Sequence, residues 1–134
     1  MNHLKNLYHA FKAVPEKYLF VLAFALIYSL VSLVNHYFFR TYALDLGLYS
    51  NALYDYAHFQ WNDSTTFKQV PENLMGDHFD FYLMIYSPLV WIFGSYTLLI
   101  IQIVSVLFGG LGVHRYFREN RFQAALAQLF FYSF

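Results

Sequence analysis

The chain has 134 residues, of which 59% are hydrophobic, 23% aromatic and 12% charged. An average soluble domain carries about 25% charged residues, and a disordered chain combines low hydrophobicity with high charge, so this composition excludes disorder. The 8 basic side chains are balanced by 8 acidic ones, which excludes a basic nucleic-acid-binding domain. Because the chain has no cysteine, it forms no disulfide and no thiolate zinc site. The class that remains is a piece of a membrane protein.

The first long segment without charge covers residues 18–39, which are 22 residues without Asp, Glu, Lys or Arg. As a helix this segment extends roughly 33 Å, enough to cross a hydrocarbon core of about 30 Å. A buried core helix is the alternative, but so short a chain could hardly bury a helix that is apolar on all sides. A cleaved signal peptide has a shorter apolar stretch, followed by a small-residue cleavage site. We therefore predict an uncleaved transmembrane helix over 18–39, preceded by an N-terminal segment over 1–17.

A second uncharged run covers residues 81–114, which at 34 residues is too long for one span and too short for two spans and a turn. Pro88 and Gly94 punctuate it, and we divide it at Gly94. The division predicts a surface or re-entrant helix over 78–93 that is too short to cross, and a transmembrane helix over 96–113. Three glycines near the end of that span favour close helix contact: Gly109, Gly110 and Gly112.

A third uncharged run covers residues 122–134 and reaches only about 20 Å as a helix. It is typical of a transmembrane helix that is cut off partway, after a turn over 114–121. We expect the chain to be the N-terminal part of a longer polytopic protein.

Charge predicts the orientation of these helices. Residues 1–17 carry three lysines and one glutamate, a net charge of 3 − 1 = +2, and residues 114–121 carry three arginines and one glutamate, again 3 − 1 = +2. Residues 40–95 carry two basic and six acidic side chains, 2 − 6 = −4. Lys and Arg near membrane ends stay cytoplasmic. We expect a multi-pass protein of the cell membrane with a cytoplasmic N-terminus and an extracytoplasmic loop over 40–95.

The outer loop contains a helical pattern of its own. Apolar residues recur at three- and four-residue spacing over 45–60, as in Leu46, Tyr49 and Leu53, which predicts an amphipathic helix on the membrane surface. Residues 61–76 are rich in polar and turn-forming side chains and predict a loop. The predicted fold class is therefore an all-α membrane protein: a span, two membrane-parallel or re-entrant helices in an outer loop, a second span and the start of a third.

Asp45 is the first candidate for chemistry, because it follows the first span at the start of the predicted surface helix. One interpretation is an N-cap, in which the carboxylate accepts amide hydrogens of the first turn. The other is a general base held at headgroup depth, within reach of a group carried on a membrane lipid. Spacing alone favours the cap.

The densest polar cluster is the sequence Gly-Asp-His-Phe-Asp over residues 76–80. Asp77 and Asp80 have the spacing of a capping box, and His78 could donate to a phosphate or titrate near neutral pH. Two carboxylates and an imidazole also suit a divalent cation, although the spacing matches no recognised metal motif. No other cofactor is indicated. Arg40 is a candidate to neutralise a lipid phosphate, with snorkelling to the interface as the alternative.

The residues Asp45-Leu46-Gly47 and Gly76-Asp77-His78-Phe79, placed after a first span and followed by Pro88 and Gln102, resemble the family of membrane proteins called domain of unknown function 2079. The resemblance covers roughly residues 40–118 of this chain. That family has Gln where this chain has Asn51, which is shorter by one methylene.

The family is in turn similar to the C-type integral-membrane glycosyltransferases, whose first outer loop carries an acidic catalytic residue. Asp45 is the matching position. The resemblance implies transfer of a sugar from a polyprenyl-phosphate donor, with Asp45, Asp77 and His78 in catalysis and Arg40 and Asn51 in substrate binding. The implied partners are membrane lipid and that donor, with no nucleic acid, and the chain alone is expected to be inactive.

Two other functions stay open from the sequence. A non-catalytic membrane binding or assembly module would use the acidic loop to contact a partner or a cation. A transporter fragment is less favoured, because transport pathways usually carry charges inside the spans and neither predicted span does.

Overall fold

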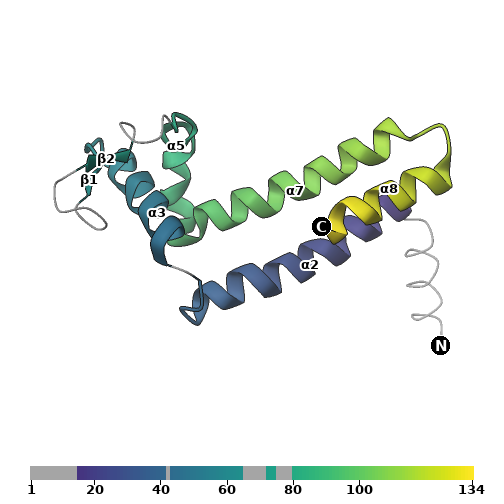
Figure 1. Ribbon diagram of the computed structural model, residues 1–134, viewed down its shortest axis with the longest axis horizontal. Helices are drawn as coiled ribbons and strands as arrows, with labels where there is room; N and C mark the ends of the chain where they lie inside the picture. The colour runs from purple at the N-terminus through teal and green to yellow at the C-terminus, as the bar shows by residue number, and fades with distance from the viewer. Residues whose placement is uncertain (1–14, 42, 65–71, 75–79) are drawn as a thin grey trace, which may run out of the picture. The chain divides into compact units, whose positions relative to one another are not determined.

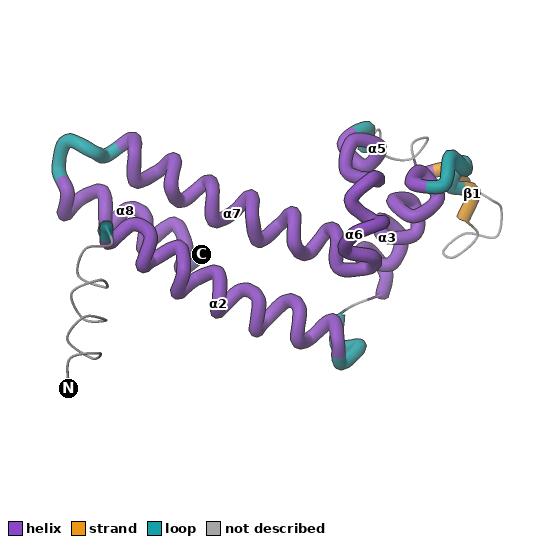
Figure 2. Tube along the Cα trace, turned by 180° about the vertical axis from the view of Figure 1, so that it is seen from behind, coloured by secondary structure: helices purple, strands orange, loops and turns teal. Residues whose placement is uncertain are grey.

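The computed structural model describes residues 15–41, 43–64, 72–74 and 80–134. The elements are helices α2 (Glu16–Tyr37), α3 (Ala43–Ala57), α5 (Tyr82–Tyr86), α6 (Val90–Phe93), α7 (Thr97–Tyr116) and α8 (Arg121–Ser133), the 3₁₀ helices η1 (Ser87–Leu89) and η2 (Gly94–Tyr96), and the strands β1 (Asp63–Ser64) and β2 (Glu72–Asn73) (Figure 1). Helix dominates the described residues, and the two strands are only two residues long each (Figure 2). The prediction of an all-helical fold is confirmed.

Two helical segments are long and apolar enough to cross a membrane. The first is α2, with 22 residues, and the second is the 35-residue stretch Tyr82–Tyr116; an 18-residue window within each has a mean hydropathy of 2.1 and 2.0, respectively. The second stretch bends at Gly94, where φ is +55°. Because that φ suits glycine better than any other residue, α6 ends there and α7 begins three residues later.

The end of α2 lies two residues before the predicted boundary of the first span. Phe39 has φ +55°, its amide donates to the His36 carbonyl over 3.0 Å, and the Arg40 amide donates to the Asn35 carbonyl over 2.8 Å. These two bonds form a Schellman motif, in which the residue in the left-handed conformation is usually glycine. The apolar composition of Phe38 and Phe39 predicted a longer helix, whereas the backbone has already turned there.

The chain divides into two compact units, of which the first combines Met1–Val31 with Gln102–Phe134. Helix α8 is tied in this unit to both other helices. The Gln128 side-chain amide donates to the Lys17 carbonyl over 3.1 Å, and the Tyr28 hydroxyl donates to the Tyr132 carbonyl over 2.5 Å. The Tyr132 hydroxyl donates to the Leu107 carbonyl over 2.6 Å. Polar bonds of this kind hold apolar helices together where lipid removes the hydrophobic driving force.

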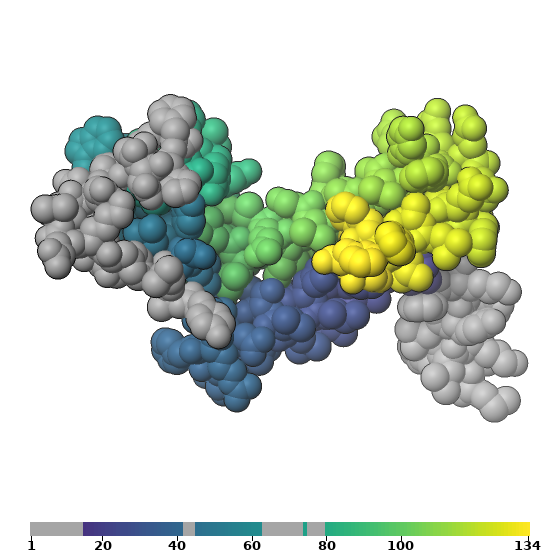
Figure 3. Space-filling model, viewed as in Figure 1, coloured from purple at the N-terminus to yellow at the C-terminus, as the bar shows by residue number. Residues whose placement is uncertain are grey.

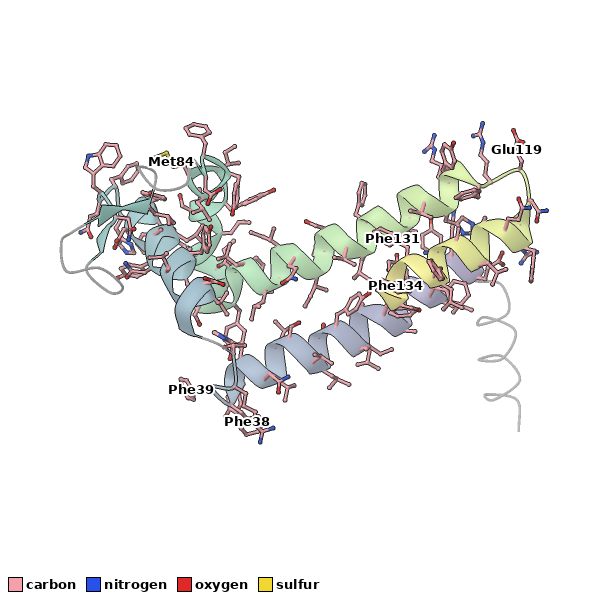
Figure 4. The ribbon with its side chains drawn as sticks, viewed as in Figure 1. Phe38, Phe39, Met84, Glu119, Phe131 and Phe134 are labelled. Carbon is pink, nitrogen blue, oxygen red and sulfur yellow. The ribbon has the colours of Figure 1, made fainter. Side chains whose placement is uncertain are left out.

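Two glycines of α7 lie close to aromatic rings of α8. Helix α8 is yellow in Figure 3, and its Phe131 is labelled in Figure 4. A Cβ atom built on Gly110 would lie 2.1 Å from Cε1 of Tyr132, and one built on Gly109 would lie 3.0 Å from Cζ of Phe131. The predicted close contact is confirmed at these two positions. At Gly112 a Cβ atom would meet no atom within 4 Å among the described residues, so close contact there stays a prediction.

The start of α8 is fixed by a side-chain cap. Asn120 has extended backbone angles, and its Oδ1 accepts hydrogen bonds from the amides of Phe122 over 3.0 Å and Gln123 over 3.2 Å. Asparagine is among the residues preferred at this position, because its short side chain reaches the free amides of the first turn. Beside the cap, Arg121 forms an ion pair with Glu16 at the start of α2.

The second unit, Ser32–Ile101, has its core between α3 and α5. Ala52, Leu53 and Tyr56 of α3 are buried with Leu83 of α5 and with Leu74. The apolar face predicted for this helix is therefore real, although α3 covers 43–57 where the pattern predicted 45–60. This face packs against α5 and forms the core of the unit, whereas the position of α3 on the membrane surface stays a prediction.

The helix predicted over 78–93 is divided in the described residues, which begin again at 80. Helix α5 gives way to η1 at Ser87, with Pro88 in the first turn of η1, and α6 follows. Proline lacks the amide hydrogen that a continuous helix requires, so the chain changes its hydrogen bonding there. Within the loop predicted over 61–76, β1 and β2 pair antiparallel, with Asp63 opposite Asn73.

Candidate functional site

Asp45 lies in the first turn of α3, and its side chain is exposed. Because α3 begins at Ala43, Asp45 is the third residue of the helix, so the N-cap interpretation is wrong. A carboxylate in the first turn is still favoured by the partial positive charge at the helix N-terminus. Among the described residues, no side chain donates a hydrogen bond to it. The Asp45 carboxylate is therefore open to solvent and to a ligand.

Tyr49 lies one turn further along α3 than Asp45, and its hydroxyl is hydrogen-bonded to the Asp80 carboxylate. Burial is the main cause that raises the pKa of the Tyr49 hydroxyl, followed by a hydrogen bond with the Asp80 carboxylate and by the negative charges of Asp80 and Asp45. A helix turns about 100° per residue, so Asp45 and Tyr49 share one face of α3. The fold thus brings together Asp45, Tyr49 and Asp80, the last of which is 35 residues away from Asp45 along the chain.

Two polar atoms near Asp80 are buried without a partner among the described residues. They are Oδ2 of Asp80 and the hydroxyl of Tyr56. Burial raises the pKa of Tyr56, and the charges of Asp55 and Asp80 add to the effect. Because leaving a buried polar group unsatisfied costs about 1–3 kcal/mol, such atoms are rare in native proteins and mark places where a ligand can be recognised.

Asn51 belongs to a different polar cluster. Its Nδ2 donates to Oδ2 of Asp55 over 3.4 Å, and Nδ2 of Asn62 donates to the same oxygen over 2.9 Å. Asn62 is fully buried, and its Oδ1 has no partner among the described residues. Asn51 is six residues from Asp45, which places it about 120° around the helix. The structure therefore does not place Asn51 on the face that carries Asp45.

Arg40 is exposed in the turn between α2 and α3, with its guanidinium carbon 5.5 Å from the centre of the Phe38 ring. This is a cation–π distance, and it leaves the guanidinium hydrogens open to an anion. Within the described part of the chain, no carboxylate pairs with Arg40.

Asp77 and His78 lie outside the described residues. Among the residues described, no three His, Asp or Glu side chains come together as a metal-binding group.

His36 fixes the turn that leads to Asp45. Its Nδ1 lies 3.0 Å from the Thr41 hydroxyl, and its Nε2 lies 3.1 Å from the Ser95 hydroxyl. The ring of Tyr96 meets the imidazole edge-on, with 4.7 Å between the ring centres. One histidine thus joins the end of α2, the Arg40–Thr41 turn and η2, which positions the start of α3.

Sequence reasoning missed Tyr49 as a site residue and treated Asp80 only as a capping or metal-binding residue. Tyr49 was included in the apolar face of the helix, which accounts for its ring but not for its hydroxyl. A tyrosine on a buried face is a usable signal, because its hydroxyl needs a hydrogen-bond partner there.

Comparison with known proteins gives one match. A family model described as "Predicted membrane protein (DUF2079)" matches residues 35–134. No curated protein and no solved structure matches the chain.

Proposed function

The chain belongs to the DUF2079 family of predicted membrane proteins, and we propose that it is the N-terminal part of a membrane glycosyltransferase that uses a polyprenyl-phosphate-linked sugar. Membership of this family and the apolar helices make it a membrane protein. The single observation that carries the enzymatic proposal is the exposed carboxylate of Asp45, directly after the apolar helix α2 and on the face shared with Tyr49.

The proposal includes an orientation. The protein is multi-pass in the cell membrane, its N-terminus is cytoplasmic, and the acidic segment over 40–95 faces outward. Support comes from the charge distribution, +2 before the first span, −4 between the spans and +2 after the second. This orientation puts Asp45 at the outer membrane surface, where a lipid-linked sugar meets an acceptor dissolved in water.

In the proposed reaction, the hydroxyl oxygen of the acceptor attacks the anomeric carbon of the sugar. Asp45 takes the hydroxyl proton as general base. The bond between the anomeric carbon and the phosphate oxygen breaks, and the lipid phosphate leaves with the electron pair. Because attack and departure occur on opposite faces of the sugar, the configuration inverts.

Other residues serve the substrates in this proposal. Arg40 and His78 donate to the departing phosphate, since cationic donors stabilise the charge that develops there. Asp77 assists His78 in catalysis. Asn51 gives up its 3.4 Å hydrogen bond to Asp55 and binds a substrate hydroxyl instead. The hydrogen bond between Tyr49 and Asp80 orients the face of α3 that carries Asp45.

The test replaces Asp45 with Asn in the full-length protein. The variant and its parent are reconstituted into liposomes with polyprenyl-phosphate glucose or polyprenyl-phosphate mannose, and sugar transfer to a cell-envelope acceptor extract is measured. We expect Asp45→Asn to abolish transfer while expression and insertion persist, because the amide cannot take the proton. Glu119→Gln is the matched control, since Glu119 is also an exposed carboxylate and lies outside the outer segment.

Unchanged transfer by Asp45→Asn would remove the base and contradict the enzymatic proposal. In that case, the outer segment would be better explained as a non-catalytic binding or assembly module. Partial loss in His78→Ala would support a role in leaving-group stabilisation, whereas full activity would remove His78 from the site.

A further inference from the structure

An aromatic cleft of about 590 Å³ lies in the second unit, where the end of α3 faces α5, η1 and α6. We call it the tryptophan cleft, because it is lined by both tryptophans of the chain, Trp61 and Trp91. Met84 of α5, labelled in Figure 4, and Pro88 of η1 line it on the same side as Trp91 of α6, and Trp61 follows the end of α3 on the other side. The lining is mostly apolar, with Gln60 and Ser87 among its polar side chains, which is the character of a site for a hydrocarbon ligand. The cleft lies at the C-terminal end of α3, roughly 16 Å along the helix from Asp45, although Tyr56, which lines it, is on the same side of the helix as Asp45.

The cleft exposes large aromatic side chains. Trp61 is 70% exposed and Trp91 is 68% exposed. The Trp91 ring packs against His58 in a tilted arrangement, with 4.6 Å between the ring centres and 44° between the ring planes, which orients the indole. Contiguous exposed apolar surface of this kind marks an interaction site, and in membrane proteins tryptophan gathers at the boundary between lipid and water.

Phe59, at the rim of the cleft, is held in an unfavourable backbone conformation. It has φ +58° and is 99% exposed. Its amide donates to the Tyr56 carbonyl over 3.2 Å, and the Gln60 amide donates to the Asp55 carbonyl over 2.9 Å, so α3 ends in a Schellman motif. Glycine adopts this conformation without strain, whereas phenylalanine does not. Among the described residues, this ring is almost fully exposed at the rim of the cleft, so it is available to contact a ligand there.

The side of the cleft formed by α5, η1 and α6 indicates which class of ligand the cleft binds. Residues of α5, η1 and α6 belong to the apolar stretch Tyr82–Tyr116, which is longer than a bilayer requires. Helix α7 alone, with 20 residues, reaches about 30 Å, the thickness of a hydrocarbon core. With α7 as the proposed span, the α5–α6 wall adjoins its end, which would bring the wall to the level of the lipid headgroups and ester groups.

A polar atom on the cleft fits the same occupant. Tyr56 lines the cleft and is 8% exposed, and its hydroxyl is buried without a partner among the residues that the structure describes. A hydroxyl can donate to an ester carbonyl or a phosphate oxygen. A phospholipid offers both an apolar chain and such an oxygen at the end of that chain.

We propose that the tryptophan cleft binds one phospholipid of the surrounding bilayer, with an acyl chain against Phe59, Trp61 and Trp91 and a headgroup or ester oxygen at the Tyr56 hydroxyl. The proposal does not depend on the enzymatic function, because it uses none of the residues assigned to sugar transfer. It gives the outer segment a second attachment to the membrane besides the two spans.

Intrinsic fluorescence tests the proposal directly, because both tryptophans of the chain line the cleft. The full chain is reconstituted into nanodiscs of phosphatidylcholine, with and without phosphatidylcholine brominated on its acyl chains. We expect the brominated lipid to quench more than half of the emission. Trp61→Phe and Trp91→Phe should each leave one quenched tryptophan.

Phe59→Gly is the decisive variant, because binding and stability should change in different directions. Glycine relieves the strain at φ +58°, so the thermal midpoint should not fall, while quenching by the brominated lipid should fall by at least half. Phe39→Gly is the matched control, since it makes the same change at the end of α2 and should leave quenching intact.

Equal quenching in Phe59→Gly and its parent would overturn the cleft as a lipid site. Emission that responds to added glucose or mannose but not to brominated lipid would also overturn it, and would indicate a sugar site. Full quenching by aqueous iodide without quenching by brominated lipid would place both rings in water and contradict the proposal.

Discussion

Replacing Gly110 with alanine is the sharpest structural test of how α7 and α8 associate. The new Cβ atom would lie 2.1 Å from Cε1, 2.2 Å from Cζ and 2.5 Å from the hydroxyl oxygen of Tyr132. Carbon atoms in contact are separated by about 3.5–4.0 Å, so the ring must retreat by at least about 1.4 Å. Tyr132 is only 2% exposed, and its hydroxyl is bonded to the Leu107 carbonyl, so this retreat breaks packing and a hydrogen bond together.

The magnitude follows from these losses. Overpacking a filled interior costs about 1–3 kcal/mol, and stranding the Tyr132 hydroxyl costs about another 1–3 kcal/mol. Alanine returns up to about 1 kcal/mol through its higher helix propensity. We expect Gly110→Ala to lower the free energy of unfolding by about 2–4 kcal/mol.

The assay is the loss of helical circular dichroism on titration with SDS in mixed micelles. Gly112→Ala is the matched control, because it lies on the same helix and its Cβ atom would meet no atom within 4 Å in the structure. That variant should be unchanged or more stable by up to about 1 kcal/mol. The reasoning is refuted if Gly110→Ala is as stable as Gly112→Ala.

Three further outcomes are expected from the same titration. Asn120→Ala should lower the free energy of unfolding by about 1 kcal/mol, because two amides of α8 lose their cap, whereas Asn120→Asp should retain most of it. Phe39→Gly should raise it by up to about 1 kcal/mol, since relief of the left-handed strain exceeds the entropy cost of glycine; a clear loss would show that the exposed ring is needed for folding. Arg121→Gln should be less stable than the parent at low salt and equal to it at high salt, because its ion pair with Glu16 is exposed; a salt-independent effect would mean that packing is responsible.

Much of the fold could be predicted because its signals are local. The absence of charge over 18–39 identifies an apolar helix, and a glycine with positive φ ends α6 where Gly94 punctuates the apolar run. The apolar spacing around Leu53 identifies the buried face of α3. What could not be predicted is what covers that face, because α5 lies some 30 residues further along the chain.

In the candidate site too, local sequence signals predict some features, whereas others depend on tertiary contacts. The first turn of α3 follows directly from the end of α2, so Asp45 could be chosen from position alone. The hydrogen bond between Tyr49 and Asp80 is a tertiary contact that no local spacing contains. The cleft was also unpredicted, since Trp61 lies in a stretch that predicts a polar loop, and a left-handed Phe59 contradicts the usual preference for glycine.

The glycines of α7 illustrate the limit of a composition signal. All three glycines suit close helix contact, but only those on the side of α7 that faces α8 lie against α8. Gly110 and Gly109 lie against rings of α8, and Gly112 does not. The sequence indicates which helix can form a close contact, whereas the packing determines which of its glycines lie in that contact.

The proposed function requires that the segment with Asp45 faces outward between two membrane crossings. Because the chain has no cysteine, single cysteines can report this orientation. Gln60→Cys and Glu119→Cys variants of the full-length protein would be treated in intact cells with a membrane-impermeant maleimide. We predict that Gln60→Cys reacts at once and that Glu119→Cys reacts only after permeabilisation. Labelling of Glu119→Cys in intact cells, with Gln60→Cys protected until permeabilisation, would contradict the account.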